Sequence, residues 1–146
     1  MHAHAVTNPG AALLACMQRI AAAGLSQGSS GNASVRSAKG FWITPTGMAP
    51  QRMHADDAVE IDPGGRVLAG TLRPSSEWPM HAAIYRARPD AQAIVHCHSR
   101  HATALACCGR DIPAFHYMVA VAGGDSIRCS PYALFGSQAL AEQAVA

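Results

Sequence analysis

Two histidines separated by a single residue, His96 and His98, most constrain what this chain can fold into. Residues at positions i and i+2 point to the same side of a β-strand but to nearly opposite sides of a helix, so two such imidazoles can share a metal ion only where the chain is extended. The segment 93–98 follows a Pro-Asp pair and carries a β-branched run, which predicts a mostly buried strand. The pattern therefore indicates a metal site at the C-terminal end of a strand, where open α/β sheets place their ligand crevices.

A serine pair followed by a glutamate, Ser75, Ser76 and Glu77, lies about twenty residues before these histidines. Residues 76–87 predict a helix with Ser75 or Ser76 as its cap and Glu77 in its first turn. A carboxylate beside a metal held by imidazoles can move a proton while the metal polarises a carbonyl, so Glu77 is the candidate base. Two alternatives stay open: the histidines can be ordinary hydrogen-bonding residues, and Glu77 can simply complement the helix dipole.

Three segments rich in glycine and hydroxyl groups, 28–32, 46–47 and 75–76, have the composition of phosphate-binding loops. Backbone amides and small hydroxyls hold a phosphate through hydrogen bonds, assisted by the dipoles of helix N-termini. None of the three matches the P-loop or the dinucleotide fingerprint, and each alone is typical of a turn or a helix cap. Their joint presence indicates a phosphorylated small molecule as the ligand.

The alternation of elements predicts one α/β domain over residues 1–146, with three layers around a mixed sheet. The expected helices are 9–23, 76–87, 100–108 and a last one from Gly136 or Ser137 to the final residue; the expected strands are 33–36, 41–44, 59–61, 66–68, 93–98 and 115–121. A chain of 146 residues that is 49% hydrophobic is large enough to bury a single core.

Charge and cysteine content exclude several classes of protein. A net charge of +2 with scattered basic residues and only 5% aromatic residues argues against nucleic acid or a membrane surface as a partner. No apolar run is long enough to span a membrane, and the N-terminus lacks the pattern of a secretory signal, so the expected location is the cytoplasm. The five cysteines have no zinc-finger spacing and are expected to be buried thiols in a reducing compartment.

Five segments of the chain together resemble the class II aldolase/adducin family in order and spacing. They are 24–32 (GLSQGSSGN), 43–47 (ITPTG), 75–78 (SSEW), 95–98 (VHCH) and 116–117 (HY). The similarity extends from about residue 10 to the end of the chain and is strongest to the L-fuculose-phosphate aldolase branch. The resemblance implies a three-layer α/β/α fold whose mixed sheet is largely antiparallel.

The resemblance also implies a reaction, namely zinc-dependent cleavage of a small ketose 1-phosphate into dihydroxyacetone phosphate and an aldehyde. It implies zinc ligation by His96 and His98, with Glu77 touching the metal when substrate is absent and shuttling the proton. The implied phosphate-binding residues are Gly31, Asn32, Thr46, Gly47, Ser75 and Ser76. In the family the sites lie between the subunits of a tetramer, so Tyr117 is expected to act in catalysis and Phe135 to complete a neighbour's pocket. The alternative for both aromatic residues is core packing.

One departure from the family concerns the metal. The third zinc histidine of the family belongs to a strand beyond the position of Ala146, so His96 and His98 are expected to recruit Glu77, His101 or a partner chain. His101, in the following helix, is more typical of a surface position. We therefore expect a member of the family truncated at its C-terminus. Two other functions stay open: a metal-dependent decarboxylase or other lyase acting on a phosphorylated keto acid, and a non-catalytic, adducin-like assembly module.

Overall fold

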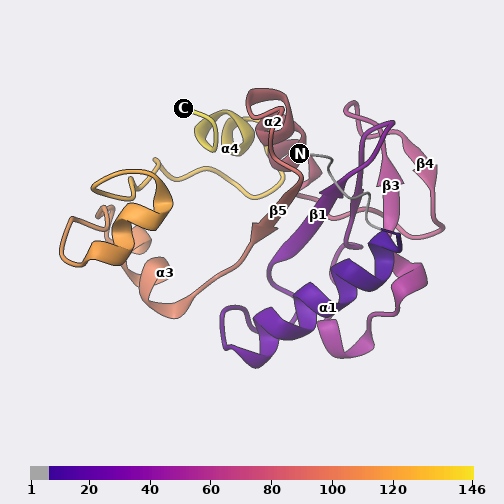
Figure 1. Ribbon diagram of the computed structural model, residues 1–146, viewed down its shortest axis with the longest axis horizontal. Helices are drawn as coiled ribbons and strands as arrows, with labels where there is room; N and C mark the ends of the chain where they lie inside the picture. Colours follow the sequence, from indigo (N-terminus) through magenta and orange to yellow (C-terminus); the bar gives the residue numbers. More distant parts are fainter. Residues whose placement is uncertain (1–6) are drawn as a thin grey trace.

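A five-stranded antiparallel sheet forms the centre of the computed structural model, which describes residues 7–146 (Figure 1). The strand order is β4-β3-β2-β1-β5. The strands are β1 (Asn32–Arg36), β2 (Phe41–Ile43), β3 (Val59–Ile61), β4 (Val67–Ala69) and β5 (Ala93–His96). The helices are α1 (Pro9–Ala22), α2 (Trp78–Ala87), α3 (Arg100–Cys107) and α4 (Gln138–Gln143), with short 3-10 helices η1 (Pro50–Arg52), η2 (Ala55–Asp57) and η3 (Tyr117–Ala122).

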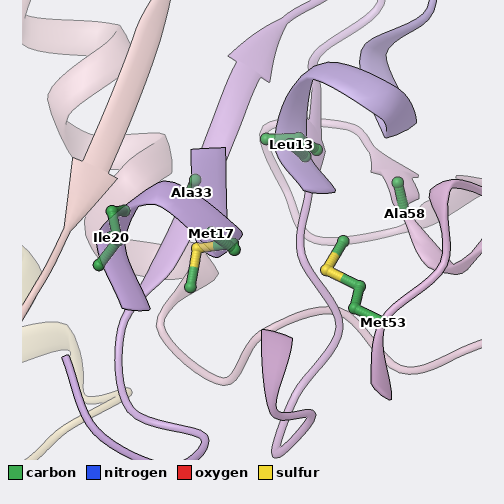
Figure 2. Close-up of a cluster of buried hydrophobic side chains, with 6 residues drawn as sticks. All are labelled: Leu13, Met17, Ile20, Ala33, Met53 and Ala58. Carbon is green, nitrogen blue, oxygen red and sulfur yellow. The ribbon is translucent and has the colours of Figure 1, made fainter. Parts of the chain in front are cut away.

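Helix α1 covers one face of the sheet. Its start is fixed by Asn8, whose side-chain oxygen accepts a 2.9 Å hydrogen bond from the amide of Ala11, and by Pro9 in the first turn. The helical spacing of its apolar residues turns one stripe toward β1 and the segment 53–58. Figure 2 shows the resulting cluster, which consists of Leu13, Met17, Ile20, Ala33, Met53 and Ala58.

Helix α2 covers the opposite face. Phe41 and Ile43 point toward it, whereas Trp42 between them packs with the α1 cluster, as the two-residue period of a strand requires. The second buried cluster consists of Phe41, Ile43, Val59, Ile61, Ala82 and Tyr85. Helix α4 lies beside α2 (Figure 1). These layers confirm the expected α/β/α fold, and all four strand pairings are antiparallel.

The expected strand at 115–121 is wrong. Most of this segment forms η3. His116 precedes this helix as its N-cap and accepts a hydrogen bond from the amide of Met118, and Gly123, with a φ of +93°, follows its last residue. A strand needs a neighbour for its backbone groups, and the described sheet ends at β5. The side chains of Phe115 and Val121 are 75% and 76% exposed, and the chain around α3 lies to the side of the sheet in Figure 1.

Three smaller expectations also need correction. Strand β5 is an edge strand of the described sheet rather than a mostly buried one, since Val95 is 51% exposed. Helix α4 ends at Gln143 instead of continuing to the last residue. The cysteines are free, but Cys107 and Cys108 are exposed thiols. Within residues 7–146, no helix combines the length and the apolar character needed to cross a membrane.

Candidate active site

The loops at 44–47 and 73–76 meet beside the ends of β1 and β5. The amide of Ser75 donates to the carbonyl of Thr44 at 2.9 Å, and the amide of Thr46 donates to the carbonyl of Arg73 at 3.1 Å. These bonds bring two of the glycine- and hydroxyl-rich segments to one wall of a cavity of about 220 Å³. The cavity is lined by Ser29, Ser30, Gly31, Asn32, Pro45, Thr46, Gly47, Ser75, Ser76, Glu77, His98 and Phe135. All six residues expected to bind phosphate therefore line one space.

Gly31 brings the third loop close to β5. Its φ of +83° lies in the left-handed region, and a Cβ at this position would come within 2.9 Å of the carbonyl oxygen of His96 and 2.7 Å of Oγ of Ser26. Ser26 in turn accepts a 3.0 Å hydrogen bond from the amide of His98. The close approach at Gly31 thus sets where the histidine-bearing segment runs relative to the cavity.

Glu77 is the N-cap residue of α2 rather than a member of its first turn, because the helix begins at Trp78, two residues later than expected. Its amide donates to Oγ of Ser75 at 3.3 Å, and its carboxylate turns toward β1 and β5. There Oε2 accepts a 2.7 Å hydrogen bond from Nδ2 of Asn32 and lies 2.6 Å from Nδ1 of His96.

The second carboxylate oxygen of Glu77, Oε1, makes no hydrogen bond with any described residue. Every fully buried side-chain oxygen of the described residues has a hydrogen-bond partner. The unpartnered Oε1 is therefore not fully buried, and it is open to the cavity that Glu77 lines. Burial alone would raise the pKa of Glu77, but the hydrogen bond and charge of His96, together with the bond from Asn32, hold that pKa below its ordinary value. The side chain is therefore an ionised, cavity-facing carboxylate at neutral pH.

His96 and His98 lie side by side, with ring centroids 4.7 Å apart, although only His96 belongs to β5. The closeness of the two rings is the same-side arrangement expected of an i, i+2 pair. Two imidazoles and a carboxylate are the donor types of catalytic zinc sites, so the chemistry of the residues present fits this metal. Among the described residues, however, no three histidine, cysteine, aspartate or glutamate side chains are placed to hold a metal ion together.

The sequence analysis did not identify a buried polar cluster that is hydrogen-bonded to Asn32. His81 on α2 is fully buried, and its Nε2 lies 2.5 Å from Oδ1 of Asn32. Oγ of Ser34 lies 2.7 Å from Nδ1 of His81 and 2.9 Å from the hydroxyl of Tyr85. The signal was present: polar residues recur every fourth position on an otherwise apolar helix.

The two aromatic residues expected to serve a neighbouring subunit are both exposed, and only one of them lines the cavity. Phe135 is 67% exposed and lines the cavity of its own chain. Tyr117 is 78% exposed, stacks near His116 and lines a separate depression around η3. His101 is an exposed residue of α3. The assignment of Tyr117 and Phe135 to a neighbouring subunit stays a prediction.

Fold and site together agree with a comparison against protein families. The chain belongs to the class II aldolase and adducin family, because the N-terminal domain of that family matches residues 11–146.

Individual relatives are similar over most of this chain. An L-fuculose phosphate aldolase of Escherichia coli strain K12 is 51% identical over 119 residues, which are 82% of this chain and 55% of that protein. A 5-methylthioribulose-1-phosphate/5-deoxyribulose-1-phosphate aldolase of Rhodospirillum rubrum is 46% identical over 134 residues, which are 92% of this chain and 60% of that protein. A solved structure of an L-fuculose 1-phosphate aldolase superposes with a TM-score of 0.89 at 37% identity, covering 95% of this chain and 66% of that one. The chain thus spans little more than half the length of these curated relatives.

Proposed function

We propose that this chain carries the catalytic core of a metal-dependent aldolase that cleaves a small ketose 1-phosphate into dihydroxyacetone phosphate and an aldehyde. One observation carries the proposal: a single cavity is lined by Glu77, by His98 and by the three loops rich in glycine and hydroxyl groups. The names of the two curated relatives support it, since both describe aldolases that act on sugar phosphates.

The phosphate end of the cavity would be formed by uncharged groups. Thr46, Gly47, Ser75 and Ser76 offer hydroxyls and backbone amides, and the described lining includes neither lysine nor arginine. Such a wall binds a phosphate by hydrogen bonds in a partly dry site, aided by the N-terminus of α2. Gly31 would complete this wall from the other side.

Glu77 would move the proton at the reacting carbon. When the bond between C3 and C4 of the ketose breaks, the C4 hydroxyl gives up its proton and becomes the aldehyde, while the electron pair stays on the dihydroxyacetone phosphate half and C3 receives a proton. The ionised carboxylate of Glu77 would take up the first proton and return it to C3. Oε1 of Glu77 is accessible for that transfer, while Oε2 is held by Asn32 and His96. A carboxylate with one oxygen anchored and one free suits a base that must keep its position through the reaction.

A zinc ion held by His96, His98 and Glu77 would supply a Lewis acid for the carbonyl and hydroxyl oxygens of the substrate. Tyr117 would act on the aldehyde half, and Phe135 would close the pocket of a neighbouring subunit in a homotetramer located in the cytoplasm. The exposure of both aromatic side chains in the single chain supports this role, since they are free to contact a second copy.

The first measurement is the zinc content of the purified chain after dialysis, with a His96→Ala/His98→Ala variant as the control. We expect about one zinc per chain, lost in the variant. The zinc-loaded chain should then release dihydroxyacetone phosphate from L-fuculose 1-phosphate or 5-methylthioribulose 1-phosphate, and none from the unphosphorylated sugars. Carbon dioxide release from a phosphorylated keto acid would favour the decarboxylase alternative. A zinc-free, inactive but oligomeric chain would favour the assembly module.

A further inference from the structure

A buried seam of polar side chains joins α2 to β1 behind the cavity. Residues four apart share one face of a helix, and residues two apart share one face of a strand. The seam consists of Glu77, His81 and Tyr85 on α2 and of Asn32 and Ser34 on β1. Each of these residues is between 0% and 8% exposed, so their polar groups need partners inside the protein, except Oε1 of Glu77, which faces the cavity.

The hydrogen-bonding roles along the seam follow from the carboxylate at its end. An ionised carboxylate only accepts, so the NH2 group of Asn32 must face Glu77, and its carbonyl must face His81. His81 must then carry its proton on Nε2 to donate to that carbonyl. The bare Nδ1 of His81 accepts from the hydroxyl of Ser34, and Ser34 accepts from Tyr85.

The environment of His81 favours this neutral tautomer. Burial lowers the pKa of His81 to about 4, so the ring is uncharged at neutral pH with one donor and one acceptor nitrogen. Phe41 stacks against the ring at 6.5 Å between centroids, which fixes the plane in which the two nitrogens point. Both nitrogens are therefore aimed at their partners by packing as well as by hydrogen bonds.

We propose that His81 is a positioning residue that locks the Asn32 amide with its NH2 group toward Glu77 and His96. Without this lock the Asn32 amide could turn over and present its carbonyl oxygen to the carboxylate, which would repel Glu77 from its position. With the lock, Oε2 of Glu77 stays anchored and Oε1 faces the cavity. The catalytic consequence rests on the proposed function; the orientation of the amide does not.

The seam is a positioning device and not a path for protons. A proton could pass along hydroxyl and imidazole groups from Tyr85 to His81, but the next link is the carboxamide of Asn32. A carboxamide does not take up a proton near neutral pH, so the chain of transfers stops there. The effect of His81 on Glu77 must be geometric.

The first part of the test needs neither zinc nor substrate. Long-range ¹H–¹⁵N correlation spectra of the labelled chain at pH 7 should show His81 with a proton on Nε2 and a bare Nδ1. The side-chain NH2 protons of Asn32 should exchange slowly with water, and should exchange at the rate of a free amide in His81→Phe. A proton on Nδ1 of His81, or a charged ring, would overturn the proposal.

The second part measures zinc affinity by competition with a chelator. His81→Phe keeps a ring of similar size but loses both nitrogens, and should weaken zinc binding by about 10- to 100-fold. His81→Gln, whose side-chain NH2 can still donate to Asn32, should restore most of the loss. Tyr85→Phe cuts the far end of the seam and should leave zinc affinity unchanged.

Equal losses in His81→Phe and Tyr85→Phe would show general loosening of α2 and would overturn the proposal, as would an unaltered affinity in His81→Phe. If the unsubstituted chain binds no zinc, the proposed function fails, while the tautomer and the exchange of the Asn32 amide still decide the role of His81. If His81→Phe does not fold, the comparison of His81→Gln with Tyr85→Phe and the spectrum of the unsubstituted chain decide it.

Discussion

Nδ2 of Asn32 donates a 2.7 Å hydrogen bond to Oε2 of Glu77 and so joins the first residue of β1 to the residue that caps α2. The same amide nitrogen lies 3.3 Å from Nδ1 of His96, which is the last residue of β5. Three elements, of which β1 is distant in the sequence from the other two, therefore meet at one side chain. The position of the candidate base depends on how α2 packs on the sheet, so changes remote from the cavity can alter its chemistry.

Glu77→Gln should strongly lower the rate of aldol cleavage without unfolding the chain. Glutamine has the same shape, and its side-chain oxygen can still accept from Asn32, but it cannot move a proton. Loss of a general acid or base lowers turnover by about 10²- to 10⁴-fold. The measurement is kcat for release of dihydroxyacetone phosphate, with the thermal midpoint recorded to verify folding. Turnover close to that of the unsubstituted chain would remove Glu77 from the mechanism.

Gly31→Ala should destabilise the chain more than Gly28→Ala does. Both glycines have a positive φ, +83° and +60°, and alanine in that region costs about 1–2 kcal/mol. Only at Gly31 would the new Cβ also press on backbone, at 2.9 Å from the carbonyl oxygen of His96, whereas Gly28 has open space around it. Urea unfolding of both variants measures the difference. Equal losses in the free energy of unfolding would mean that β5 moves away from the new Cβ at no energetic cost.

The sequence predicted the parts of the fold that depend on local signals. The start of α1 follows from Asn8 and Pro9, and the expected strand at 41–44 forms as β2. The six candidate phosphate-binding residues were identified from glycine and hydroxyl content together with the family resemblance, and they do line one cavity. Local composition and spacing are sufficient for such features because neighbouring residues decide them.

Features that depend on residues distant in the sequence could not be predicted from local patterns. The four-residue spacing of the polar residues on α2 shows that they share one helix face, but it does not show that Asn32 and Ser34 will lie opposite His81. The segment 115–121 has strand-like composition, but strand formation also needs a free sheet edge, and composition cannot supply one. Pairing of β5 with β1, which brings His96 to Asn32, is likewise a property of the whole fold.

Ser76→Ala should weaken phosphate recognition while leaving the chemical step intact. Ser76 is exposed at the cavity wall, whereas Ser75 also accepts the amide of Glu77 and is therefore a poorer probe. A hydrogen bond to a charged group contributes about 1.5–3 kcal/mol, so KM for a ketose 1-phosphate should rise roughly 10- to 100-fold with little change in kcat. Ser126→Ala, outside the cavity, is the control. A fall in kcat alone would contradict a role in binding phosphate.

Tyr117→Phe should lower aldol turnover and leave the zinc content unchanged. The side chain is 78% exposed and lies outside the cavity of its own chain, so loss of its hydroxyl should not disturb the fold or the metal ligands. Zinc analysis and kcat on the same preparation separate the two effects. Loss of zinc, or turnover equal to that of the unsubstituted chain, would count against a catalytic role for Tyr117.

His81 should make folding stability depend on pH between about 6.5 and 4. An unfolded histidine binds a proton below its ordinary pKa of 6.5, whereas burial lowers the pKa of folded His81 to about 4. The unfolded chain therefore binds more protons in this interval, and protonation favours unfolding. The contribution is fully present above pH 6.5, decreases as the pH falls, and is lost near pH 4.

The titratable groups around His81 are Glu77 and Tyr85 on α2, His96 on β5 and Arg36 beside the Tyr85 ring. Glu77, whose pKa is lowered, also loses its contribution as the pH falls, so a comparison is needed to isolate His81. The free energy of unfolding in urea should decrease between pH 7 and pH 4.5 by up to about 3 kcal/mol more in the unsubstituted chain than in His81→Gln. Glutamine does not titrate, so parallel pH profiles for the two proteins would show that His81 is not held neutral by burial. A larger loss of stability at low pH in His81→Gln than in the unsubstituted chain would contradict a lowered pKa of His81.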